Sequence, residues 1–162
     1  MIHSNVGRLL YFARRDDQAI SELRTTLELH PRQGYAHVHL GFAYESKRMY
    51  PQAIAELNTA AGLMRTRYSV GLAHVYAVAG EPAKAAQILK GLEGPGGNED
   101  DPVFTAGVYA ALGNRDKAFA KLERAYREHS FFISFIKVFP WMDPLRQDPR
   151  FASLLLRMGL TK

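Results

Sequence analysis

The chain has 162 residues, which is enough for one folded domain with a single hydrophobic core. Hydrophobic residues make up 47% and charged residues 23%, so intrinsic disorder is excluded as the main state. The absence of cysteine excludes disulfides, thiol nucleophiles and thiolate metal sites. No apolar run reaches the roughly 18 residues of a membrane-spanning helix, and the N-terminal residues are too polar for a signal peptide. We therefore expect a cytoplasmic protein with no membrane partner.

Four consecutive segments share one pattern of small and apolar residues, at about residues 1–33, 34–66, 67–98 and 99–130. A small residue recurs at intervals of 34, 32 and 33 positions, as Ala19, Ala53, Ala85 and Ala118. Nine positions before each alanine stands a large apolar residue, such as Tyr44 or Tyr76. Each segment therefore predicts two antiparallel amphipathic helices whose facing small residues let the backbones pack closely.

Prolines and glycines mark where these predicted helices begin and end. Pro51 and Pro82 fall in the first turn of a second helix, where the missing N–H is not needed. Gly80 and Gly113 fall in the turns that follow a first helix. The predicted elements are thus all α-helical, with a glycine-rich loop at residues 91–102 as a local irregularity.

The spacing of these segments resembles that of the tetratricopeptide repeat, whose pattern reads W-x2-L-G-x2-Y, then A-x3-F, then A and P. The second segment carries the resemblance best, through Leu40, Gly41, Tyr44, Ala53, Leu57 and Ala60. His37 stands where the family often has tryptophan, and Ala73 and Ala106 take the glycine position in the later segments. The resemblance implies an all-α fold, a right-handed superhelical array of antiparallel helix hairpins over residues 1–130.

Residues 131–162 differ in composition and predict a C-terminal capping segment. The run FFISFIKVFPW is aromatic and apolar, and the helix after it is ended by Gly159. Because an array of helix hairpins exposes an apolar face at its end, we expect this segment to cover that face, with a dimer surface as the alternative. The segment also resembles the ends of tetratricopeptide regions in bacterial signalling and regulatory proteins, through Asp143, Pro144, Asp148, Pro149, Arg150 and Phe151.

Neither a metal site nor a catalytic site is predicted. His37 and His39 diverge by about 200° around a helix, so the two cannot bind one ion. We expect His37 to pack, and His39 and His74 to point into a groove. No local signature of a serine nucleophile occurs, and no strand precedes the glycine-rich loop as a phosphate site would require. We therefore expect no cofactor, no metal and no enzymatic activity.

The resemblance also implies a binding groove on the concave side, which the first helices of successive hairpins line. Carried over position by position, its lining residues are Asn5, Arg8, Tyr11, Phe12, Tyr35, Val38, His39, Phe42, Glu45, Arg67, Val70, His74, Val78, Val103 and Phe104. Aromatic side chains interleaved with polar groups suit a peptide ligand. The carboxylate clamp of chaperone-binding members is not matched, since only Arg67 keeps its charge.

The predicted function is a non-catalytic protein–protein interaction module, a scaffold or adaptor that binds a peptide or helix. One alternative is a detached regulatory domain that acts on a signalling or DNA-binding domain. The net charge of +5 leaves a nucleic-acid-binding helical-repeat protein as another, but the basic residues are scattered and interleaved with acidic ones, so we expect no nucleic-acid partner. Because no helix precedes Ile2, Val6 and Leu10, we also expect weak self-association through the N-terminal repeat, or a preceding domain there.

Overall fold

The computed structural model describes residues 2–64, 69–94 and 101–160. Its elements are α1 (Ile2–Phe12), α2 (Asp16–Leu29), α3 (Gly34–Ser46), α4 (Tyr50–Met64), α5 (Ser69–Val78), α6 (Pro82–Glu93), α7 (Pro102–Ala111), α8 (Arg115–Arg127), the 3-10 helices η1 (Phe131–Phe135) and η2 (Pro140–Leu145), and α9 (Pro149–Arg157). All regular structure in the described residues is helical, which confirms the predicted all-α class. Among the described helices, none has both the length and the hydrophobicity to cross a membrane.

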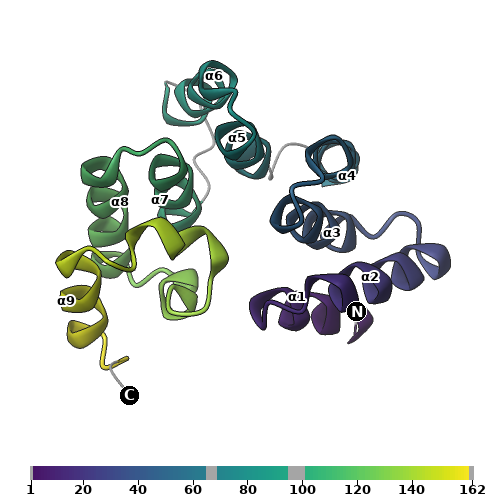
Figure 1. Cartoon of the computed structure of the whole chain (residues 1–162), viewed down its shortest axis with the longest axis horizontal. Helices are drawn as coiled ribbons and strands as arrows, with labels where there is room; N and C mark the ends of the chain where they lie inside the picture. Colours follow the sequence, from purple (N-terminus) through teal and green to yellow (C-terminus); the bar gives the residue numbers. More distant parts are fainter. Residues whose placement is uncertain (1, 65–68, 95–100, 161–162) are drawn as a thin grey trace.

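The helices pack as successive hairpins, α1 with α2, α3 with α4, α5 with α6 and α7 with α8. We call α1, α3, α5 and α7 the inner helices, because they also contact one another in succession while their partners lie outside them (Figure 1). The array of hairpins curves, so that in Figure 1 its first and last hairpins lie on opposite sides of a common centre. The surface that the inner helices turn toward this centre is called the inner face below.

Close packing within the hairpins depends on small residues. The four recurring alanines are fully buried: Ala19, Ala53, Ala85 and Ala118. Gly41 lies so close to α4 that an added Cβ would stand 2.8 Å from Cγ of Leu57, and Gly7 lies even closer to the side chain of Leu23. These are the contacts that the predicted pairing of helices requires, since a larger side chain would separate the two backbones.

The turn inside each hairpin contains a residue with a left-handed backbone. These residues are Arg14, Arg48, Gly80 and Gly113, with φ of 60°, 58°, 82° and 76°. Each stands five positions before the buried alanine of its hairpin, so the turn and the close contact recur in step. Glycine adopts this conformation without strain, whereas for arginine it costs about 1–2 kcal/mol.

Several helices begin at a side chain that accepts a backbone hydrogen bond. Asp101 accepts from the N–H of Val103 at 3.0 Å at the start of α7, and Asn114 accepts from the N–H of Lys117 at 3.1 Å at the start of α8. Such caps satisfy N–H groups that the helix itself leaves without partners. Helices α7 and α8 therefore begin at residues whose side chains stabilise the start of a helix.

The tail, residues 130–160, packs against the last hairpin through all three of its elements. η1 and α9 contact α8 and η2 contacts α7, while η1 and η2 turn toward the centre of the array (Figure 1). Residues 131–145 also lie against the inner face, which the sequence did not suggest; that the tail covers the end of the array stays a prediction. The physical reason is that the inner helices carry aromatic side chains, such as Phe42 and Phe104, against which the aromatic residues of the tail pack. Array and tail share one hydrophobic core.

The exposed edge of α1 is apolar, as the sequence suggested, but with different residues. Val6 is 39% exposed and Leu9 is 60% exposed, whereas Leu10 is half-buried and packs against the core. The side chain of Ile2 lies outside the part of the chain that the structure describes.

Candidate functional site

The indole of Trp141, in η2, lies against three of the inner helices. Its ring is parallel to the imidazole of His74 in α5, with centroids 3.9 Å apart, and edge-on to the ring of Phe42 in α3 at 4.9 Å. On α7, Gly107 leaves the space that the indole fills, because an added Cβ there would lie 2.8 Å from the Trp141 ring. Trp141 is only 2% exposed. One side chain of the tail therefore joins α3, α5 and α7.

Phenylalanine rings extend this contact to α1. Phe12 stacks on Phe135, with centroids 6.1 Å apart, and meets Phe139 edge-on at 5.9 Å. In α7, Phe104 contacts Phe132 at 4.7 Å and Phe139 at 5.7 Å. The aromatic residues of the tail thus cross the inner face from α7 to α1, and rings in these tilted and edge-on arrangements attract one another beyond the surface that they bury.

An ion pair ties the same segment to the first hairpin. Nη2 of Arg14, in the left-handed turn between α1 and α2, donates to Oδ1 of Asp143 at 2.7 Å, and Nε of Arg146 donates to the same oxygen at 2.7 Å. Burial acts to raise the pKa of Asp143, but the hydrogen bonds from Arg14 and Arg146 outweigh it and hold this pKa below its ordinary value. Because both partners are nearly half exposed, the pair contributes about 0–1 kcal/mol and mainly sets the position of the tail.

Polar groups are buried beside the tail. Nδ1 of His74 lies 3.0 Å from Oε1 of Glu45, with the two side chains 5% and 8% exposed, although the pair is not aligned as a hydrogen bond. The hydroxyl of Tyr11 and Nε1 of Trp141 are also buried, without a hydrogen-bond partner among the described residues. Burial raises the pKa of Tyr11 well above its ordinary value, and the Glu45 carboxylate raises it further. The Tyr11 hydroxyl is therefore a neutral donor.

His39 is neutral on the same face. It is half-buried in α3 and edge-on to Phe42, with ring centroids 6.2 Å apart. Burial, together with the nearby Arg8 cation, lowers the pKa of His39 to about 3. An imidazolium would have to give up water and face a like charge, so the ring stays uncharged at physiological pH.

The predicted groove residues are divided between core and surface. Tyr11, Val38, Phe42, Glu45, Val70, His74 and Val103 are buried; Arg8, Phe12, His39 and Phe104 are half-buried; Asn5, Tyr35 and Val78 are exposed. Arg67 lies outside the described residues. The sequence suggested an open groove, whereas in the structure the tail lies against much of its aromatic part. That these residues bind a partner stays a prediction.

His37 does not simply pack, as we had expected. Its Nδ1 lies 2.6 Å from Oε2 of Glu56 in α4, and its Nε2 lies 2.9 Å from the carbonyl oxygen of Pro31. The imidazole therefore links α4 to the chain that precedes α3. Across residues 2–64, 69–94 and 101–160, no three histidine or acidic side chains gather in a way that could hold a metal ion.

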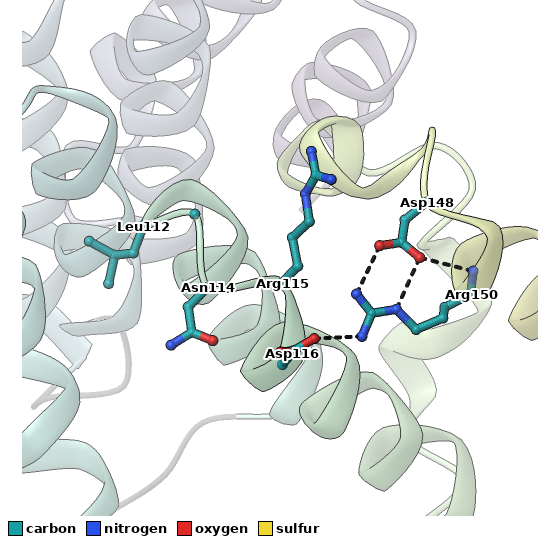
Figure 2. Close-up of a pocket in the computed structure, with 7 residues that line it drawn as sticks. Leu112, Asn114, Arg115, Asp116, Asp148 and Arg150 are labelled. Carbon is teal, nitrogen blue, oxygen red and sulfur yellow. Dashed lines mark hydrogen bonds and ion pairs between the residues drawn. The ribbon is translucent and has the colours of Figure 1, made fainter.

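A polar hollow lies where the start of α8 meets the start of α9 (Figure 2). Arg150 donates from Nη1 to Asp116 and from Nη2 to Asp148, both at 2.8 Å, and its guanidinium lies 4.2 Å from the ring centroid of Phe119. The side-chain hydrogen bond from Arg150 lowers the pKa of Asp148 to about 2. Asp148 also caps α9 by accepting from the N–H of Arg150. These charges satisfy one another, so we interpret the hollow as the joint that holds α9.

Two residues that shape the inner face escaped the sequence analysis, namely Gly107 and Arg14. Gly107 directly follows Ala106, which takes the small position of the repeat, so its own role against Trp141 has no signal in the repeat pattern. Arg14 is one of the scattered basic residues, and its position in the sequence does not distinguish it from the others. The role of each residue is visible only together with its partner in the tail, Trp141 for Gly107 and Asp143 for Arg14.

Comparisons of this chain with protein-family models, with curated proteins and with solved structures find no match.

Proposed function

We propose that the chain is a non-catalytic protein–protein interaction module of the tetratricopeptide class, a scaffold or adaptor that binds a peptide or helix on its inner face. A right-handed superhelical course of the hairpins, a cytoplasmic location and a bacterial source belong to the same proposal. Its first support is the recurrence, every 32 to 34 residues, of a buried alanine together with a left-handed turn residue. Such a recurrence is typical of stacked helical repeats.

The observation that carries the proposal is that the inner face holds a segment of chain that is not an α-helix. The 3-10 helices η1 and η2 contact it mainly through aromatic side chains, and one acidic group reaches a basic one, as in peptide recognition. Three predicted groove residues, Asn5, Tyr35 and Val78, are exposed on the inner helices α1, α3 and α5. These accessible side chains can make the first contact with a partner.

The test is affinity capture from the source cell with matched variants. Tyr35→Ala removes an exposed ring from an inner helix, and Leu29→Ala removes an exposed apolar side chain from an outer helix. We expect the captured partner to be lost with Tyr35→Ala and retained with Leu29→Ala, with equal helical circular dichroism in both. Equal capture by both variants would contradict the inner face as the binding surface.

The exposed edge of α1 favours self-association as a second interaction. Val6 and Leu9 stand one turn apart and are both substantially exposed. We expect sedimentation velocity to show a concentration-dependent dimer that Leu9→Glu abolishes. A monomer at all concentrations would remove this contact.

A further inference from the structure

The slot that holds Trp141 selects for a flat ring. One wall is the imidazole of His74, parallel to the indole at an interplanar angle of 4°, and another is the edge-on ring of Phe42. The backbone of Gly107 closes a third side so tightly that even one methyl group there would meet the indole. A branched aliphatic side chain could not fill this space with the same contacts, because both ring walls favour an aromatic partner.

A basic residue of the first hairpin contacts the same tail segment close to Trp141. Arg14, in the turn between α1 and α2, donates a hydrogen bond to the carboxylate of Asp143, two residues after the tryptophan. Arg8, which is half-buried in α1, adds a second positive charge to this side of the inner face. The array therefore presents an aromatic slot and a basic group in an arrangement that suits a Trp-x-Asp segment.

The tail segment is part of the core, but it is built of short elements and leaves two buried polar atoms without partners in the described part of the chain. Its segment consists of 3-10 turns, and it leaves α8 through His129, which has a left-handed φ of 53° although it is not glycine. The contact also leaves Nε1 of Trp141 and the hydroxyl of Tyr11 buried without hydrogen-bond partners in the described part of the chain. When the tail leaves, Nε1 of Trp141 gains water as a partner, and a ligand that also bonds the Tyr11 hydroxyl would have an advantage over the tail.

From these contacts we infer that the inner face is a receptor for an aromatic peptide segment of another protein, in which tryptophan precedes a single aspartate by two positions. Residues 139–146 of the tail occupy the receptor in the same chain, and the partner's segment replaces them. This inference rests on the proposed function and specifies its ligand. In the wild-type chain the tethered segment competes at an effective concentration in the millimolar range. The apparent affinity for a separate peptide is therefore reduced in proportion to the fraction of molecules in which the site is open.

The experiment measures binding of a fluorescein-labelled peptide with the sequence of residues 137–146, KVFPWMDPLR, by fluorescence anisotropy. The hosts are the full-length wild-type chain and full-length Trp141→Ala, which leaves the slot empty. We expect the variant to bind at least tenfold more tightly than the wild type. A peptide with alanine for tryptophan should not bind, and one with asparagine for aspartate should bind several-fold more weakly.

Two double variants test whether the slot itself is the site. Adding Gly107→Ala to Trp141→Ala should abolish peptide binding, whereas adding Gly62→Ala, at a helical glycine with open space around it, should leave binding unchanged. If circular dichroism shows that Trp141→Ala does not fold, full-length Asp143→Asn replaces it as host, and we expect it to bind two- to fivefold more tightly than the wild type. Absence of peptide binding to the folded host overturns the inference.

Two further outcomes separate this inference from other interpretations. If the wild-type chain forms a dimer that the peptide dissociates, a second copy of this chain supplies the segment. That outcome overturns the inference that the segment belongs to another protein. If the peptide fails to bind while Tyr35→Ala still abolishes capture of a cellular partner, the inference fails and the proposed function stands. If the peptide binds but capture of no cellular partner depends on Tyr35, the inference stands and the proposed use of the exposed inner-face residues fails.

Discussion

The indole of Trp141 and the imidazole of His74 lie face to face, although one belongs to the tail and the other to the third hairpin of the array. The contact brings a residue near the C-terminus onto a helix in the middle of the chain. Since the chain contains one tryptophan, its intrinsic fluorescence reports this contact directly.

The fit between Gly107 and Trp141 predicts that Gly107→Ala displaces the tail. Alanine is favoured over glycine in a helix by about 0.5–1 kcal/mol, but here its Cβ would lie 2.8 Å from the indole, and overpacking of this kind costs about 1–3 kcal/mol. We expect a red shift of the tryptophan emission, with an unchanged helical signal. The matched control is Gly62→Ala in α4, which should stabilise the protein without a shift. An unshifted emission in Gly107→Ala would show that the indole does not depend on this space.

The close approach of α3 and α4 predicts that Gly41→Leu destabilises the second hairpin. The new side chain would meet Leu57 and the carbonyl oxygen of Ala53, which is 3.3 Å from the position of Cβ and belongs to the backbone. We expect the free energy of unfolding to fall by about 1–3 kcal/mol in a urea titration. Gly91→Leu in α6, where nothing lies nearby, should change it little. Equal stability of both variants would mean that the helices are paired differently.

The left-handed turn at Arg48 predicts that Arg48→Gly stabilises the protein. Glycine removes the strain of φ near 58°, about 1–2 kcal/mol, while its greater freedom in the unfolded chain offsets about half of this. We expect a net increase of about 0.5–1 kcal/mol in thermal or urea unfolding. Arg48→Ala serves as the control, because it removes the side chain and keeps the strain, so it should not stabilise. At Arg14 the same change to glycine should be less favourable, since it also removes the contact with Asp143.

The low pKa of His39 predicts a loss of stability in weak acid. Its ordinary pKa of 6.5 applies in the unfolded chain, whereas burial and Arg8 hold it near 3 in the folded one, so between these values the unfolded state binds more protons. The free energy of unfolding should therefore decrease as the pH falls from about 6.5 toward 3, by up to about 2 kcal/mol between pH 7 and 5. In His39→Gln this part of the decrease should be absent. Identical slopes of stability against pH in the two proteins would show that His39 is not kept neutral by the fold.

The sequence by itself determined the helices, their pairing and the turns between them. Local and near-local chemistry decides these features. A buried alanine or glycine permits a close helix contact with a residue of the next helix, as Gly41 does with Leu57 sixteen positions later, and a proline or left-handed residue places the turn. Because each repeat meets only its neighbours, the pattern of one repeat is enough to place the next.

Only the tertiary structure decided where the tail lies and what the inner face is. The tail's apolar and aromatic composition predicts burial but not the surface against which it is buried, because the hydrophobic effect has no direction. Curvature of the array, which accumulates over all the hairpins, brings His74, Gly107 and Arg14 within reach of one segment. Their meeting with Trp141 and Asp143 depends on distances between residues far apart in the chain, and no repeat pattern encodes those distances.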